Sequence, residues 1–205
     1  MTADPRDAIG PAGNVFDKYG TSNPAAQMIV RRFRSRIDGI IRDTAPASML
    51  DVGCGEGVLT EAAAGLLPRA RVVGVDLPDP GLRAEWGRRA GPSFVEGSVY
   101  ELPFGDGEFE LVSALEVLEH LERPAEAVRE LARVSGRWLL VSVPLEPLWR
   151  VANVLTGRYV ASGGNTPGHV QHFSRSAVTE LIGSVARVVS ASGPLPWTIV
   201  LARVD

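Results

Sequence analysis

A glycine-rich segment at residues 50–57 has the residue types and spacing of a ligand-binding loop. It contains three alternating glycines, and Asp51 stands two residues before the first of them. Glycines permit a sharp turn and let a ligand approach the backbone closely. A second carboxylate, Asp76, ends the next apolar run, Val72–Asp76. The spacing therefore predicts a small-molecule site where a strand turns into a helix.

Two ligand classes fit such a loop. A dinucleotide site also places an acidic residue on ribose hydroxyls about 20 residues later, but it needs a third glycine where this chain has Val58. That glycine allows the close helix contact that accommodates a pyrophosphate. S-adenosylmethionine (SAM) carries an ammonium group, a carboxylate and a sulfonium but no phosphate. A nearby carboxylate such as Asp51 suits it better, so the loop favours SAM.

A second group of reactive side chains follows the apolar run at residues 109–114. Glu116, Glu119 and His120 stand at positions i, i+3 and i+4, so they share one face if this turn is helical. Two carboxylates and an imidazole could bind Mg²⁺ or Mn²⁺, and the metal would lower the pKa of an attacking hydroxyl. The alternative is a metal-free turn, in which the glutamate fixes the ligand pocket and the histidine contacts substrate or backbone.

The three histidines are His120, His169 and His172, and each is a candidate general base. The last two belong to residues 144–173, an irregular segment that is longer than ordinary connections. We expect this segment to form the acceptor site. The aromatic side chains of residues 14–23 either close over the ligand or pack on the surface as a strap. The expected substrate contacts are Tyr19, Glu116, Trp149, Arg150 and Tyr159.

Strands and helices alternate along the chain, which predicts an α/β fold with a mostly parallel sheet and helices on both faces. The expected strands are 48–52, 71–76, 93–96, 109–114, 138–143, 187–192 and 198–203. The expected helices are 25–42, 58–67, 81–89, 124–134 and a final one capped by Ser174. With no linker or repeat, residues 14–205 are expected to form one domain after a mobile tail, 1–13, with residues 14–43 as its lid and first helix.

Composition excludes several classes of protein. The 205 residues are 45% hydrophobic and 22% charged, as in an ordinary globular domain. A net charge of −3 gives no general attraction to nucleic acid. Cys54 is the only cysteine, so neither an intramolecular disulfide nor a cysteine-rich zinc site can form. No apolar run reaches the roughly 18 residues of a membrane span, and we expect a cytoplasmic location.

Three segments together resemble the class I SAM-dependent methyltransferases: Asp51–Gly57, Val72–Asp76 and Glu116–Leu121. Within that superfamily the chain is similar to the small-molecule branch that includes the quinone-biosynthesis methyltransferases, over about residues 48–143. The resemblance implies a Rossmann-like sheet of seven strands with an antiparallel last strand. It also implies methyl transfer from SAM to a small-molecule acceptor. A hydroxyl is favoured as the methylated group, with a nitrogen or carbon of a metabolite as the alternative. A SAM-binding regulator without catalysis is the alternative, and the oligomeric state stays open.

The resemblance also assigns residues. Gly53 and Gly55 should line the methionine part of the donor, Asp76 should accept from the ribose hydroxyls, and Leu77 should pack on the adenine. Where many relatives have an acidic residue for the adenine amino group, this chain has Ser98. The implied donor contacts are Asp51, Gly53, Cys54, Gly55, Asp76, Leu77, Ser98, Val99 and Leu115. Glu116, Glu119 and His120 resemble the metal ligands of ubiquinone-pathway O-methyltransferases and of small-RNA methyltransferases, but the acidic balance disfavours an RNA acceptor.

Overall fold

A computed structural model describes residues 24–145 and 170–205 as alternating strands and helices. The strands are β1 (Ser48–Val52), β2 (Arg71–Asp76), β3 (Ser93–Glu96), β4 (Phe109–Leu115), β5 (Ser135–Pro144), β6 (Arg187–Ser192) and β7 (Trp197–Arg203). The helices are α1 (Pro24–Thr44), α2 (Val58–Leu66), α3 (Pro80–Trp86), η2 (Leu118–His120), α4 (Pro124–Val134) and α6 (Arg175–Gly183), of which η2 is a 3-10 turn. Every strand and long helix expected from the sequence is present.

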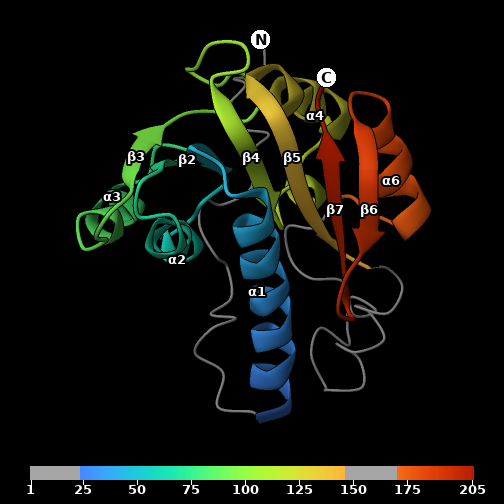
Figure 1. The fold of residues 1–205 in the computed structure, drawn as a ribbon, viewed down its shortest axis with the longest axis horizontal. Coiled ribbons are helices and arrows are strands. Elements are labelled where there is room, and N and C mark those ends of the chain that lie inside the picture. The colour runs from blue at the N-terminus through green and yellow to red at the C-terminus, as the bar shows by residue number, and fades with distance from the viewer. Residues whose placement is uncertain (1–23, 146–169) are drawn as a thin grey trace, which may run out of the picture.

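The strands form one sheet in the order β3-β2-β1-β4-β5-β7-β6 (Figure 1). The first five pair in parallel, whereas β7 runs antiparallel to both of its neighbours. This confirms the seven-stranded, mostly parallel sheet with an antiparallel last strand. The strand order reverses between β1 and β4, and in open sheets ligands bind at the carboxyl ends of the strands beside such a switch point.

Apolar side chains alternate between two cores, one on each face of the sheet. The core that involves α1 and α2 includes Phe33, Ile37, Met49, Leu111 and Leu140. The core that involves α4 and α6 includes Val112, Val128, Leu139, Val178 and Ile182. The central strands are therefore buried on both sides, which explains why they read as continuous apolar runs in the sequence.

Two element boundaries differ from the predicted ones by three residues, the start of β5 and the end of α3. β5 begins at Ser135 rather than at residue 138, because Ser135 pairs with Phe109 of β4, and it ends at Pro144, which pairs with Trp197 of β7. α3 ends at Trp86, with Gly87 as its C-cap. The predicted cap of the last helix is confirmed, since Ser174 Oγ accepts a hydrogen bond from the Ala177 amide at 3.1 Å.

α1 extends past the carboxyl edge of the sheet (Figure 1). Its residues Phe33, Ile37, Ile40 and Ile41 recur at helical spacing and are all buried. Phe33 packs against Trp197, the first residue of β7, with ring centroids 4.7 Å apart. Within residues 24–145 and 170–205, no helix has the length and apolar character needed to cross a lipid bilayer.

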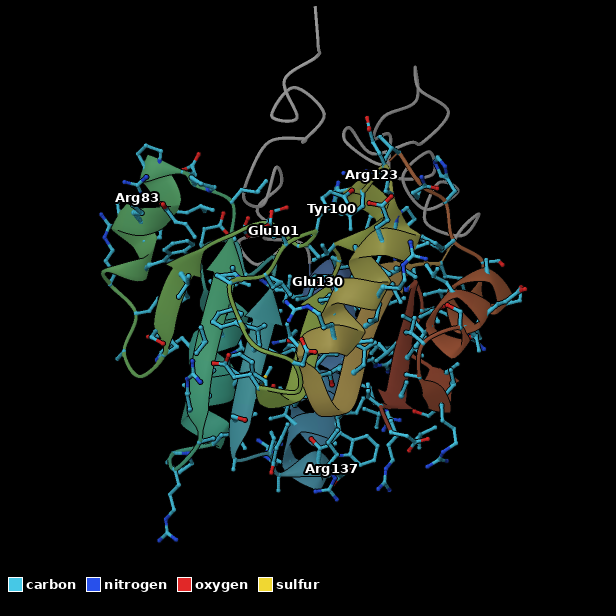
Figure 2. All side chains as sticks on the ribbon, turned by 90° about the horizontal axis from the view of Figure 1, so that it is seen from above. Arg83, Tyr100, Glu101, Arg123, Glu130 and Arg137 are labelled. Atoms are coloured by element: carbon cyan, nitrogen blue, oxygen red, sulfur yellow. The ribbon has the colours of Figure 1, made fainter. Side chains whose placement is uncertain are left out.

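Glu130 and Arg133 of α4 hold the loop that joins β3 to β4; Figure 2 labels Glu130. Glu130 accepts from the Leu102 amide at 2.7 Å and, through both oxygens, from the Arg133 guanidinium at 2.7 and 2.8 Å. Arg133 also donates to the Phe104 carbonyl and to Asp106. The hydrogen bonds from Arg133 and then from the Leu102 amide hold the pKa of Glu130 below its ordinary value.

We expect Glu130→Gln to lower the free energy of unfolding by about 2 kcal/mol at neutral pH, because hydrogen bonds to a charged group are lost. The pKa of Glu130 is lower in the folded than in the unfolded state, so its contribution is present above the ordinary value of 4.5 and disappears as the pH falls through the folded pKa. Urea unfolding from neutral to acid pH should show the two proteins converging. Glu126→Gln is the control on the same helix, because Glu126 is exposed and bonds Arg123; equal losses in both variants would contradict the prediction.

Candidate functional site

The turn between β1 and α2 is built from three glycines in the left-handed region. Gly53, Gly55 and Gly57 have φ angles of 71°, 53° and 77°. A Cβ atom at Gly53 would approach Cγ2 of Val117 to 2.5 Å, and one at Gly57 would approach Cζ of Phe94 to 2.6 Å. Both conformation and space therefore require glycine here, as the spacing predicted.

Asp76 lies beside this loop at the end of β2. One carboxylate oxygen accepts from the Gly55 amide at 2.7 Å, and the other accepts from the Leu77 amide at 2.7 Å. Burial raises the pKa of Asp76, and the two amide hydrogen bonds oppose that rise. Each carboxylate oxygen can accept more than one hydrogen bond, so Asp76 retains acceptor capacity for ligand hydroxyls.

Asp51 is buried between β1, α2 and β4. Its two oxygens accept from the Thr60 and Ser113 hydroxyls, each at 2.7 Å. Burial raises the pKa of Asp51, and the two hydroxyls only partly oppose that shift. Asp51 therefore ties the strand before the loop to the first turn of α2 and to β4.

Cys54 lies in the loop, but its surroundings do not favour the thiolate form that would make it a nucleophile. Its amide, like that of Gly53, donates to the Val75 carbonyl, which fixes the loop against β2. Burial, and then the neighbouring carboxylates of Asp51 and Asp76, raise the pKa of the thiol. The side chain lies against Gly74, where an added Cβ would come within 2.9 Å of the sulfur. Cys54 thus remains protonated and acts as a packing residue beside the site.

The segment after β3, which the resemblance assigns to adenine, forms a tight turn. The Ser98 hydroxyl accepts from the Tyr100 amide at 3.2 Å, and the Ser98 carbonyl accepts from the Glu101 amide. The Arg123 guanidinium lies over the Tyr100 ring at 4.6 Å. Figure 2 shows Tyr100, Glu101 and Arg123 together at the end of the sheet opposite Arg137. The turn therefore lies at the carboxyl edge, and the Ser98 hydroxyl contributes to holding it.

The helical face expected for Glu116, Glu119 and His120 does not form. Glu116 has a φ angle of 61°, so the helical geometry that places i, i+3 and i+4 together is interrupted at its first member. Its carboxylate accepts from the Trp197 indole at 2.7 Å and from the Ser142 hydroxyl at 3.2 Å. Among the described residues, no three acidic, histidine or cysteine side chains could hold a metal ion. The described residues therefore give no support to the predicted metal site, and Glu116 joins the ends of β4, β5 and β7.

Residues after the long irregular segment return to this edge of the sheet. The amides of Val170 and Gln171 both donate to the Glu119 carbonyl, at 2.9 and 3.0 Å. His172 follows and is exposed, whereas Phe173 is buried in the core. The structure thus brings the chain next to His172 beside the turn that carries His120. The other predicted residues lie outside the described part of the chain: Tyr19, Trp149, Arg150, Tyr159 and His169.

The sequence did not predict the contacts that Trp86, Arg89 and Phe94 make with the loop. The Trp86 indole donates to the Gly55 carbonyl at 2.7 Å, and Arg89 Nε donates to the Glu56 carbonyl at 2.9 Å. The signal available in the sequence was Gly74, a glycine inside a buried strand, which indicates the close approach of another group. That group is the Phe94 ring, 2.7 Å from where a Cβ at Gly74 would lie.

Asp51→Asn tests how the buried carboxyl group of Asp51 changes the free energy of unfolding with pH. Because the pKa of Asp51 is raised above its ordinary value of 3.8, the folded protein holds this proton more tightly than the unfolded chain does. The free energy of unfolding therefore falls as the pH rises from that value through the folded pKa. We expect the variant to lose this decline and to gain stability relative to the wild type from about pH 4 to about pH 7 in urea unfolding. Asp43→Asn, at an exposed position of α1, is the control; a difference between variant and wild type that is constant with pH would refute the expectation.

Residues 50–137 match the protein family described as a methyltransferase domain. Over 98 residues the chain is 38% identical to an uncharacterized methyltransferase of Schizosaccharomyces pombe, covering 42% of this chain and 35% of that protein. Over 102 residues it is 37% identical to the ubiquinone biosynthesis O-methyltransferase of Thiobacillus denitrificans, covering 46% of this chain and 43% of that protein. The chain therefore spans less than half the length of these curated relatives.

The fold has close counterparts among solved structures. Magnesium protoporphyrin IX methyltransferase from Synechocystis PCC 6803, with bound S-adenosylhomocysteine (SAH), aligns with a TM-score of 0.68 at 19% sequence identity. The alignment covers 98% of this chain and 92% of that one. Residues 50–137 thus match the methyltransferase-domain family, and the chain has the fold of this solved methyltransferase.

Proposed function

We propose that this protein transfers a methyl group from SAM to the hydroxyl of a small-molecule acceptor. The observation that carries the proposal is the pairing of Asp76 with the glycine loop. A carboxylate is held by the Gly55 and Leu77 amides at the end of β2, directly beside a left-handed glycine turn. This arrangement suits a ligand that has a ribose at one end and an amino-acid group at the other.

The donor is proposed to lie across the carboxyl ends of β1 and β2. Its methionine part follows Gly53 and Gly55, its ribose hydroxyls bond Asp76, and its adenine packs on Leu77. Because the Ser98 hydroxyl already accepts from the Tyr100 amide, the Val99 backbone is the better candidate to bond the adenine amino group. Cys54, Leu115 and the buried Asp51 support the pocket through packing and charge.

Catalysis of methyl transfer depends mainly on aligning the acceptor oxygen with the methyl carbon of SAM. The methyl carbon bonds to the acceptor oxygen as its bond to sulfur breaks, the sulfonium leaves as a neutral thioether, and the acceptor proton passes to a base. Orientation of the two reactants alone can contribute roughly 7–11 kcal/mol. His120, His169 and His172 are the candidate bases. The hydrogen bonds from Val170 and Gln171 to the Glu119 carbonyl support this choice, because they bring the end of the 144–173 segment beside His120.

The acceptor is proposed to bind between this segment and the donor. Relatives include a ubiquinone biosynthesis O-methyltransferase and a malonyl-[acyl-carrier protein] O-methyltransferase, which favours oxygen over nitrogen or carbon as the methylated atom. Trp149, Arg150 and Tyr159 are the proposed substrate contacts within 144–173, and Tyr19 that of the lid. A SAM-binding regulator without catalysis is the second candidate, and the absence of labelled product from SAM with any acceptor panel would favour it.

Asp76→Ala should weaken SAH binding by roughly ten- to a hundredfold, because charge-assisted hydrogen bonds to the ribose are worth about 1.5–3 kcal/mol. Isothermal titration calorimetry measures the change directly. Asp106→Asn is the control, since Asp106 is an exposed carboxylate in the loop before β4, at the opposite edge of the sheet. Unchanged SAH affinity in Asp76→Ala would exclude the proposed donor site.

The base is tested once an acceptor is found by screening hydroxyl compounds with labelled SAM. The variant that removes the true base, His169→Ala or His172→Ala, should lose roughly 10²–10⁴-fold in turnover while keeping its SAH affinity. We expect the larger effect at His169, because its glycine neighbour permits closer approach of a substrate. If both variants turn over normally, neither histidine is the base, and His120→Ala becomes the test.

A further inference from the structure

Two consecutive carbonyl groups of the glycine loop accept hydrogen bonds from side chains that lie 31 and 33 residues later in the sequence. The buried Trp86 indole donates to the Gly55 carbonyl at 2.7 Å. Arg89 Nε donates to the Glu56 carbonyl at 2.9 Å. A peptide unit is planar and trans, so fixing its carbonyl also fixes its N–H direction. Two peptide planes of the loop are therefore oriented by the end of α3 and the turn that follows it.

The same region fills the space behind the loop. The rings of Trp86 and Phe94 stack with centroids 5.2 Å apart and an interplanar angle of 6°. Phe94 in turn lies where a Cβ at Gly57 or at Gly74 would be, at 2.6 and 2.7 Å from its ring atoms. The stacked pair is thus wedged between the loop and β2, and it leaves little room for the loop to change its left-handed turns.

A third contact ties this region to the helix after the loop. Arg89 Nη1 lies 3.2 Å from Glu61 of α2, and the other oxygen of Glu61 accepts from the Ala90 amide at 2.9 Å. Arg89 therefore bridges the Glu56 carbonyl of the loop and the first turn of α2. Gly55 is held from both sides, because its amide donates to Asp76 and its carbonyl accepts from Trp86.

We propose that Trp86 and Arg89 are positioning residues for the methyl donor. Their hydrogen bonds hold the glycine loop in its ligand-ready form, so that Asp76 and the Gly55 amide keep their places before the donor arrives. Binding that needs no rearrangement of the loop is tighter, because the ordering of the backbone has already been achieved in the fold. This inference rests on the proposed function, since it assigns how the same donor site is shaped.

The experiment compares SAH affinity by calorimetry in the wild type and three variants. Trp86→Phe keeps an aromatic ring to stack on Phe94 but has no N–H for the Gly55 carbonyl, and a tenfold weaker affinity is expected, corresponding to about 1.4 kcal/mol. Arg89→Lys keeps a cation for Glu61 but cannot also reach Glu56 with the same geometry, and a loss of about threefold is expected. Trp138→Phe removes an indole from β5, away from the loop, and should bind as the wild type does.

The outcomes distinguish a positioning role of Trp86 and Arg89 from a general effect on stability. Weaker binding in both loop variants, with normal binding in Trp138→Phe and unchanged urea midpoints, supports the positioning role. Wild-type affinity in Arg89→Lys and in Trp86→Phe overturns it while leaving the donor site intact. Equal weakening in Trp138→Phe also overturns it, because the effect would then be one of general stability. If Trp86→Phe does not fold, Arg89→Lys decides alone; a wild type that binds no SAH overturns the proposed function and this inference with it.

Discussion

The left-handed turn after β1 is the constraint on which the site depends. Three glycines take positive φ angles there, and the space at two of them is already filled by Val117 and Phe94. The turn brings the Gly55 amide to the Asp76 carboxylate, so a hydrogen bond of 2.7 Å joins the loop after β1 to the side chain at the end of β2. A side chain at Gly53 or Gly57 would add backbone strain as well as a steric clash.

Carboxylates gather around this turn at the carboxyl ends of the strands. Asp51, Asp76 and Glu116 belong to the ends of β1, β2 and β4, and each is bonded by neutral donors from the protein. Burying a carboxylate is costly, and hydrogen bonds from hydroxyl, amide and indole groups offset part of that cost. The arrangement is nevertheless well suited to the proposed ligand, because SAM carries a sulfonium and an ammonium group whose positive charges would be drawn to this edge.

The two faces of the sheet make different contacts with residues near its carboxyl edge. On the α1 and α2 face, Phe33 packs on Trp197, and the Trp197 indole donates to Glu116. On the other face, Glu130 and Arg133 of α4 fix the loop between β3 and β4. Both faces therefore contribute to this edge: α1 packs on the tryptophan that bonds Glu116, and α4 bonds the backbone of the loop between β3 and β4.

The sequence by itself determined the strands, the glycine loop and the position of Asp76. These features depend on neighbours in the chain: uninterrupted apolar runs for the doubly covered strands, and alternating glycines for a turn that only glycine forms easily. The sequence left open whether the turn at Glu116 is helical, because the positive φ of Glu116 accompanies contacts with Ser142 and Trp197, which lie 26 and 81 residues away. Trp86 and Arg89 were missed for the same reason, since their bonds to the loop span 31 and 33 residues. Tertiary structure alone decided which side chains hold the site in place, because packing across the sheet, and not local spacing, brings their donors and acceptors within hydrogen-bonding distance.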